Sequence, residues 1–167
     1  MQYKALVIGL LAAVSVGPAV ADEAKEQAAV AKQLSSAKIT LQQGLTASES
    51  KGKPISGKFE VDEGHFQLSI YISQGTALQE VVVDHTTGSV AKSEPLSEAE
   101  DVAEAKKQAA AMAKATVSLK AAVDKAEQGS PGYRAVSIEP MLKANHALGE
   151  VSLVKGTQFK SVSVPLE

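Results

Sequence analysis

The chain has 167 residues, of which 44% are hydrophobic and 22% are charged, a composition typical of one globular domain or two small ones. It contains no cysteine, which excludes disulfides, thiol catalysis and cysteine-ligated zinc. The net charge of −2 and the 4% of aromatic residues argue against a nucleic-acid partner and against an anionic membrane surface.

The first 21 residues have the pattern of a secretory signal peptide. Lys4 precedes the apolar run Ala5–Val16, which is too short to span a bilayer, and Ala19-Val20-Ala21 is an A-x-A cleavage signature. We therefore expect a bacterial Sec-type signal peptide cleaved after Ala21, a periplasmic or secreted protein, and no membrane insertion after cleavage. The alternative is that the segment stays uncleaved and anchors the chain.

Residues 22–96 begin with two predicted helices. The segment 24–32 is rich in Ala, Lys and Gln and has the weak apolar face of a largely solvated helix. Thr40 and Gln43 indicate a capping box at the start of a second, shorter helix, since each side chain can satisfy a free backbone N–H of the other residue. Gly52-Lys53-Pro54 is a strong helix stop.

Four strands are predicted after this stop. Apolar and polar residues alternate over 55–61 and 66–72, with Asp62-Glu63-Gly64 as the turn between them. Residues 78–84 form a third strand, and a turn at Thr87-Gly88 leads into a fourth strand within 89–96. Strands joined by such short turns pair antiparallel, and the helices must cover their apolar face because a lone small sheet is unstable.

Residues 97–167 repeat this order of elements. Ser97 and Glu100 indicate a capping box at the start of a helix, and Ser118 is the predicted N-cap of a second one. Strands are then predicted around 136–138, 151–153 and 159–164, so the second part has one strand fewer than the first.

Short segments of the two parts resemble each other directly. "ITLQQGL" at Ile39–Leu45 recurs as "VSLKAAV" at Val117–Val123, shifted by 78 positions, and "IYISQGT" at Ile70–Thr76 recurs as "VSLVKGT" at Val151–Thr157, shifted by 81. Such a unit is longer than solenoid repeats, whose period is roughly 20–50 residues. We predict an α+β fold of two similar small units, 22–96 and 97–167, each a helical segment packed on a three- to four-stranded antiparallel sheet.

The order helix, strands, then "VVVDHTTGSV" resembles the PepSY domain family, which is known from propeptides of secreted metallopeptidases and from bacterial envelope proteins. The matching features are the stretch from Thr40-Leu41 to Gly52-Lys53-Pro54 and the Asp84-x-x-Thr87-Gly88 turn. The resemblance covers about residues 38–96, and residues 116–167 less completely, because that part lacks the Asp-x-x-Thr-Gly turn and the strand after it. It implies binding or inhibition of a peptidase and carries over no catalytic residues.

Three histidines are the only side chains that suggest site chemistry. His65 and His146 stand 81 positions apart, each after a turn and before a strand. The simpler interpretation is a polar turn residue in each unit, and the other is a repeated metal or ligand contact. The chain has no paired-ligand metal motif, nucleophile elbow or phosphate-binding loop, so we expect no catalytic residue, no cofactor and no enzyme activity.

The last predicted strand is the candidate binding site. If the second unit is one strand short, this strand exposes unpaired N–H and C=O groups, which can pair with an incoming strand. We expect only one of the two N–H groups of Ser161 and Ser163 to point toward the free edge. The alternative is that the first unit or a second molecule covers the edge. The residues expected at the site are Gln158, Lys160, Ser161 and Ser163.

These observations predict an exported, non-catalytic binding module whose partner is a secreted or envelope protein, with a peptidase as one candidate. In that role it would inhibit a peptidase or regulate an envelope protein. The alternative is a periplasmic small-molecule or metal-responsive protein that uses His65 and His146.

The cleavage signature predicts the mass of the exported protein. The intact mass of chain recovered from an expressing bacterium should correspond to a polypeptide that begins at Asp22. A mass that retains the apolar run would show an anchored protein.

Overall fold

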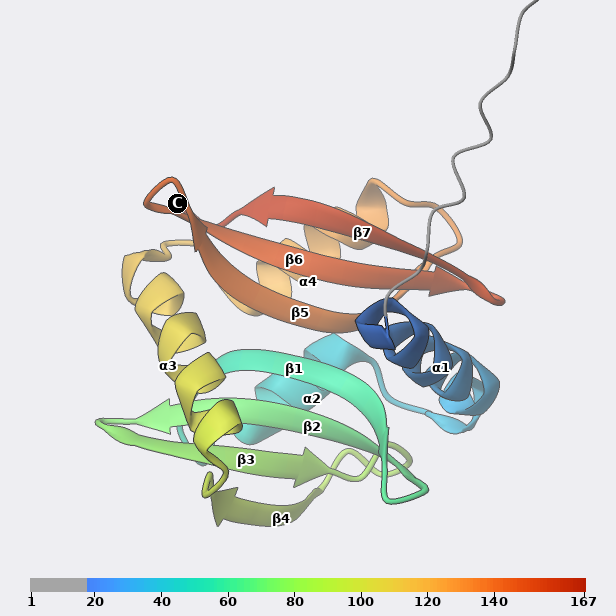
Figure 1. Ribbon diagram of the computed structural model, residues 1–167, viewed down its shortest axis with the longest axis horizontal. Coiled ribbons are helices and arrows are strands. Elements are labelled where there is room, and N and C mark those ends of the chain that lie inside the picture. The colour runs from blue at the N-terminus through green and yellow to red at the C-terminus, as the bar shows by residue number, and fades with distance from the viewer. Residues whose placement is uncertain (1–17) are drawn as a thin grey trace, which may run out of the picture.

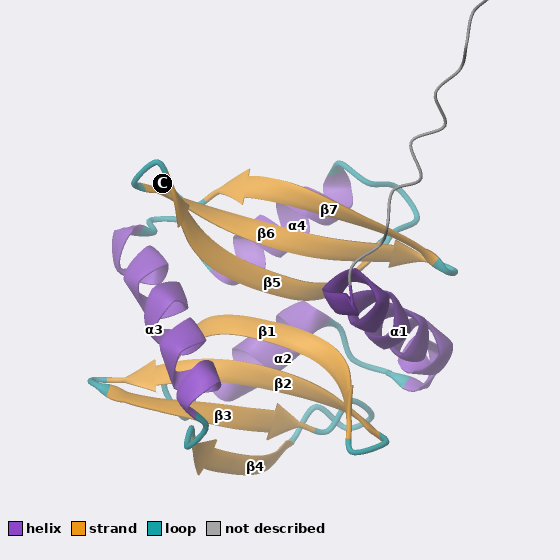
Figure 2. Ribbon diagram, in the orientation of Figure 1, coloured by secondary structure: helices purple, strands orange, loops and turns teal. Residues whose placement is uncertain are grey.

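The computed structural model describes residues 18–167 (Figures 1 and 2). The first part contains α1 (Pro18–Gln33), the 3-10 helix η1 (Leu34–Ser36), α2 (Leu41–Ser48), β1 (Lys53–Asp62), β2 (His65–Gln74), β3 (Ala77–Val83) and β4 (Val90–Pro95). The second part contains α3 (Ala99–Lys114), α4 (Leu119–Gln128), β5 (Arg134–Lys143), β6 (His146–Lys155) and β7 (Gln158–Pro165).

The predicted signal peptide lies mostly outside the described residues, and its cleavage therefore stays a prediction. Among the described residues, no helix is both long enough and apolar enough to cross a membrane.

All seven strands belong to one antiparallel sheet, in the order β4-β3-β2-β1-β5-β6-β7. The predicted α+β class is confirmed. The strands of the two parts do not form separate sheets, however, because β1 and β5 pair edge to edge. Their pairing is short, Gly57↔Ile138 and Lys58↔Ser137, and the two strands then diverge toward both ends (Figure 1).

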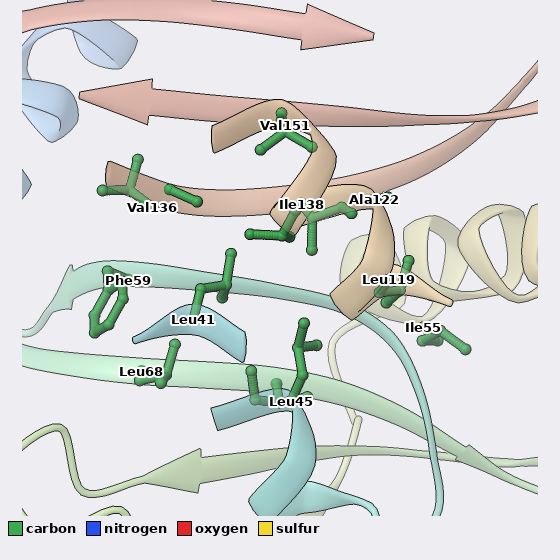
Figure 3. Close-up of a cluster of buried hydrophobic side chains, with 14 of the residues drawn as sticks. Leu41, Leu45, Ile55, Phe59, Leu68, Leu119, Ala122, Val136, Ile138 and Val151 are labelled. Atoms are coloured by element: carbon green, nitrogen blue, oxygen red, sulfur yellow. The ribbon is translucent and has the colours of Figure 1, made fainter. Parts of the chain in front are cut away.

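The helices cover both faces of this sheet. In the view of Figure 2, α1 and α3 lie in front of the strands and α2 and α4 lie behind them. Apolar residues spaced four apart give α2 and α4 one buried face each, and these faces pack on the alternating apolar side chains of the strands (Figure 3). The helix residues that carry this packing are Leu41, Leu45, Leu119 and Val123.

Two of the three predicted helix caps are confirmed. Thr40 and Gln43 form the reciprocal capping box of α2, and the Ser118 hydroxyl accepts a hydrogen bond from Ala121 N–H at the start of α4. The predicted capping box of Ser97 and Glu100 is wrong. The Leu96 N–H still bonds to the strand β3, which keeps the chain extended, and α3 begins two residues after Ser97 with no side-chain cap.

A glycine lets α2 lie close to the sheet. A Cβ atom added at Gly44 would overlap Cδ2 of Leu68, a side chain of β2 that is completely buried. Because protein interiors are packed as densely as organic crystals, this overlap cannot be relieved without moving the helix or the leucine.

This contact predicts that the effect of Gly44→Ala on the free energy of unfolding depends on whether the Leu68 side chain is present. Gly44→Ala should destabilise the protein by about 1–3 kcal/mol through overpacking, and Leu68→Ala should cost about 2–5 kcal/mol through the cavity it leaves. In the Leu68→Ala background the space is vacated, so Gly44→Ala should be neutral or stabilising by up to about 1 kcal/mol from helix propensity. Denaturant unfolding of the three variants measures these free energies.

The matched control is the neighbouring residue on the opposite face of β2. Gln67 donates hydrogen bonds to Glu60 and Ser69 and is only partly buried, so Gln67→Ala should cost no more than about 1.5 kcal/mol. Equal effects of Gly44→Ala in both Leu68 backgrounds would contradict the predicted contact.

Candidate functional site

Strand β7 forms one edge of the sheet and has β6 as its only strand neighbour among the described residues (Figure 1). The four residues predicted at the site, Gln158, Lys160, Ser161 and Ser163, all lie on this strand. The position of β7 thus agrees with the expectation that the last strand is an edge, while the binding of a partner there stays a prediction.

The backbone direction of β7 follows from one hydrogen bond beyond its end. Leu166 N–H donates to Ala147 C=O at 2.9 Å, and the β6–β7 register is continuous from that point. N–H groups alternate between the two sides of an antiparallel strand, so the even-numbered residues of β7 point toward β6. Both Ser161 and Ser163 therefore direct their N–H groups outward, and the expectation that only one of them does is wrong. Residues that are two positions apart on a strand direct their N–H groups to the same side of it.

The serine side chains of β7 hold a carboxylate on the neighbouring strand. Ser163 Oγ donates to Glu150 Oε2 at 2.6 Å, and Ser161 Oγ donates to the other oxygen. These two hydrogen bonds, from Ser161 first and then Ser163, hold the pKa of Glu150 below its usual value. Lys160 lies on the opposite face, with Nζ 4.4 Å from the ring centroid of Tyr133. Glu150 is thus an anchored negative charge next to the free edge.

Glu150 belongs to a polar face, which we define as the sheet face that carries α1 and α3. Hollows on this face lie between the two helices and are lined by side chains that include Lys58, Glu139 and Ser152. Lys58 Nζ forms an ion pair with Glu60 Oε2 at 2.6 Å. The polar face therefore combines one strong ion pair with several carboxylates, and its floor is formed by the middle of the sheet.

Two carboxyls of the polar face that stand opposite each other have pKa values shifted in opposite directions. Glu139 and Glu150 stand opposite each other on β5 and β6. Partial burial raises the pKa of Glu139, and the nearby carboxylates add to this effect, whereas Lys58 opposes it. Sequence analysis missed both residues as site candidates, although they occupy polar positions of alternating strands and could have been assigned to the solvent-facing side.

The two edges of the sheet differ in charge. At the β4 edge, Lys92 and Glu94 form an exposed ion pair at 2.6 Å and Pro95 removes a backbone donor. Charges and proline on an edge strand discourage pairing with another chain. Strand β7 likewise ends in a proline, Pro165, but it carries one charged side chain, Lys160, in place of an ion pair, and its central outward N–H groups belong to Ser161 and Ser163.

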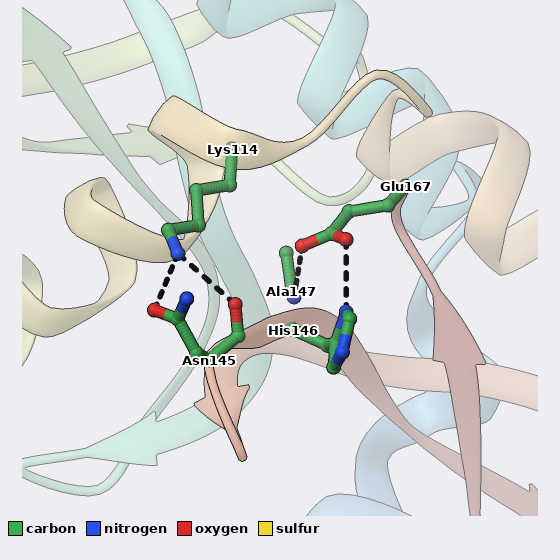
Figure 4. Close-up of polar contacts among 5 residues, drawn as sticks. All are labelled: Lys114, Asn145, His146, Ala147 and Glu167. Carbon is green, nitrogen blue, oxygen red and sulfur yellow. Dashed lines mark hydrogen bonds and ion pairs between the residues drawn. The ribbon is translucent and has the colours of Figure 1, made fainter.

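The structure does not bring the histidine candidates together. His65 opens β2 and His146 opens β6, and these strands run antiparallel, which places the two residues at opposite ends of the sheet. His146 Nδ1 lies 3.1 Å from Glu167 Oε2, and Ala147 N–H donates to the other oxygen of that carboxylate, so this histidine helps to fasten the last residue (Figure 4). Residues 18–167 contain no group of three or more His, Asp or Glu side chains that could hold a metal ion.

A neighbouring contact in Figure 4 fixes the turn between β5 and β6. Lys114 Nζ, at the end of α3, donates to the backbone carbonyl of Asn145 at 3.0 Å and to its side-chain oxygen at 2.5 Å. Asn145 has a positive φ of 68°, which asparagine tolerates in tight hairpin turns. These contacts join the end of α3 to the β5–β6 turn.

Comparison with known proteins adds little. No family model matches the chain, and no curated protein matches it. A similar solved structure is the crystal structure of a protein from Clostridium difficile 630 that is provisionally described as a lipoprotein. It is 16% identical, with a TM-score of 0.41, over 73% of this chain and 81% of that chain. A likeness at that level does not establish a shared fold or function.

The opposite pKa directions of Glu139 and Glu150 predict opposite effects of removing each charge. Glu139→Gln should stabilise the protein at neutral pH, because a carboxyl with a raised pKa is destabilising when ionised. Glu150→Gln should destabilise it at neutral pH, because a lowered pKa marks an ionised form that the folded state favours.

The effect of Glu139→Gln should vanish as the pH falls below the ordinary Glu pKa of 4.5, where that carboxyl is protonated in both the folded and the unfolded state. The effect of Glu150→Gln should only begin to fall there, and it should vanish below the lowered pKa that Glu150 has in the folded state. Thermal unfolding from neutral to acidic pH measures this. Two variants that shift the midpoint in the same direction at neutral pH would contradict the prediction.

Proposed function

We propose that the chain is an exported, non-catalytic binding module that pairs an extended segment of a secreted or envelope protein with the outer edge of β7. The observation that carries this proposal is the row of outward N–H groups on the terminal strand, which includes those of Ser161 and Ser163. Main-chain hydrogen bonds along such an edge supply affinity, and side chains next to it supply selectivity.

We also propose that the two parts of the chain are copies of one unit. Gly57 and Ile138, which pair at the junction of β1 and β5, are 81 positions apart, so each residue faces its own counterpart. The register of the first hairpin in each part is interrupted at Ile55 and at Val136, which are again 81 positions apart. Equivalent positions in the pairing and in its irregularities support a duplication.

A third correspondence involves the loop before each second helix. In both parts, the N–H groups of two successive residues donate to one backbone carbonyl that follows the third strand. These bonds run from Lys38 and Ile39 to His85, and from Thr116 and Val117 to Leu166.

In this duplication β7 is the counterpart of β3. The two strands follow equivalent turns and pair with β6 and β2 in the same register, Val154↔Phe159 and Ser73↔Leu78. The outer edge of β3 is occupied by β4. The first part of the chain therefore supplies an internal example of a strand seated on the edge that β7 presents to solvent.

The resemblance to PepSY domains leads us to propose a peptidase or another envelope protein as the source of the bound segment. The metal- or ligand-responsive alternative is less well supported, because His65 and His146 lie at opposite ends of the sheet and cannot share one ligand.

The test uses linear peptides selected by phage display against the chain from Asp22 onward. Ser163→Pro removes one outward N–H, and the affinity of the selected peptides should fall about tenfold or more, since one hydrogen bond and one close approach are lost. Ser163→Ala should change the affinity much less, because it keeps the backbone donor. Fluorescence anisotropy measures the binding constants, and circular dichroism verifies folding.

Two further proline variants serve as controls. Ser93→Pro places the same change on the outward side of β4, and peptide binding should persist. Val162→Pro removes an N–H that points toward β6 and should unfold the strand. Selected peptides that bind Ser163→Pro as well as the wild type, or a selection that yields no binding peptide, would refute the proposed site.

A further inference from the structure

Strand β4 carries both signs of charge at the edge of β3, a lysine and a glutamate that form an ion pair with each other. Lys92 on β4 stands opposite Val82 of β3, and Glu94 stands opposite Glu80. The hydrogen-bonded ion pair with Glu94 raises the pKa of Lys92, and the Glu80 carboxylate acts in the same direction. The lysine of the added strand therefore lies close to a carboxylate of the strand that receives it.

The second part of the chain has a corresponding carboxylate, displaced by one strand. In the first part, Ser69 Oγ on β2 donates to Glu80 Oε1 on β3 at 2.6 Å. Ser69 and Glu80 correspond, 81 positions later, to Glu150 on β6 and Ser161 on β7. Serine and glutamate have thus exchanged strands, while the hydroxyl–carboxylate contact is kept.

The position of Glu150 suits a cation that arrives from outside β7. Its carboxylate leans toward β7, because both of its oxygens accept hydrogen bonds from serines of that strand. Adjacent strands are about 4.8 Å apart, so a residue on an added strand is about two such spacings from the Glu150 backbone, a gap that a lysine or arginine side chain and the glutamate side chain can bridge together. The hollow next to it is lined by Glu139 and also by Lys160.

We propose that the segment bound by β7 runs antiparallel to it and carries a lysine or arginine opposite Ser163, whose charged group crosses β7 to reach Glu150. This inference rests on the proposed function and specifies its ligand. The position opposite Ser163 corresponds to that of Lys92 opposite Val82.

The other face of the edge disfavours the same charge. Lys160 occupies that face together with Val162 and Val164, so a basic residue of the bound segment would meet a like charge there. The side chains of an added strand alternate between the two faces, and the edge should therefore select for a basic residue on the polar face and for small or apolar residues on the opposite face. Strand β4 shares the small residues of this pattern, since Lys92 alternates with Ala91 and Ser93, but its polar face also carries Glu94.

The experiment uses the β4 sequence itself as the probe. A synthetic peptide with residues 88–96, GSVAKSEPL, is titrated into the ¹⁵N-labelled chain, and the amide signals of Ser161 and Ser163 report on the edge. The same peptide with Lys92→Glu should bind more weakly, by roughly two- to fivefold or more, as expected for one exposed ion pair. Added salt should reduce the difference between the two peptides.

Protein variants test whether Glu150 is the charge that the lysine of the peptide contacts. Glu150→Gln should bind both peptides with similar affinity, while Glu49→Gln, an exposed glutamate on the distant end of α2, should keep the wild-type preference. Since Glu150→Gln replaces one of the two oxygens that accept from the serine hydroxyls with an amide NH2 group, its folding is verified from its amide spectrum. The Lys92→Glu peptide tests the same charge without changing the protein.

The outcomes separate this inference from the proposed function. Both peptides shifting the Ser161 and Ser163 signals with equal affinity would overturn the basic-residue requirement and leave strand addition intact. Neither peptide binding, together with no effect of Ser163→Pro on selected peptides, would overturn both. A peptide-free dimer that Ser163→Pro dissociates would assign the edge to a second copy and would overturn the proposal of a basic partner segment.

Discussion

The short pairing of β1 with β5 is the constraint on which the rest of the structure depends. Only the pairs Gly57↔Ile138 and Lys58↔Ser137 join the two parts of the sheet, and the strands diverge on either side of them. Each diverging gap leaves backbone and apolar surface that must be covered. Helices α1 and α3 lie across the two gaps, as Figure 1 shows, and this fixes them on the same face of the sheet.

Basic side chains fasten the segment that follows α1, and the end of α3, across the junction. The Arg134 guanidinium at the start of β5 donates to the carbonyls of Leu34, Ala37 and Ile39, and it lies 5.4 Å from the ring centroid of Phe59. At the other gap, Lys53 Nζ donates to the Met112 carbonyl near the end of α3 at 3.1 Å. Positive groups at helix C-terminal carbonyls are favourable, so each part of the chain stabilises a helical segment of the other.

The positions of the helices determine which parts of the sheet are left uncovered and available for binding. Helices α2 and α4 cover the back of the sheet, and helices α1 and α3 cover part of its front (Figure 2). Strand β7 is also covered by α4 on one face, but its outer edge pairs with no strand of the described chain. Both edge strands end in a proline, and they differ in that β4 carries the Lys92–Glu94 ion pair whereas the middle of β7 is serine-rich.

The sequence by itself determined the local elements, because period-2 and period-3.6 patterns and the caps at Thr40 and Ser118 depend only on neighbouring residues. It also predicted the last strand as the candidate site. It could not determine that β1 and β5 join, since that pairing has two residue pairs and no turn to specify it. Nor could it predict Glu150 as an anchored charge, because the serines that hold it come from a different strand. Such contacts between distant residues are decided by strand register and by how the two parts pack, and only the tertiary structure sets these.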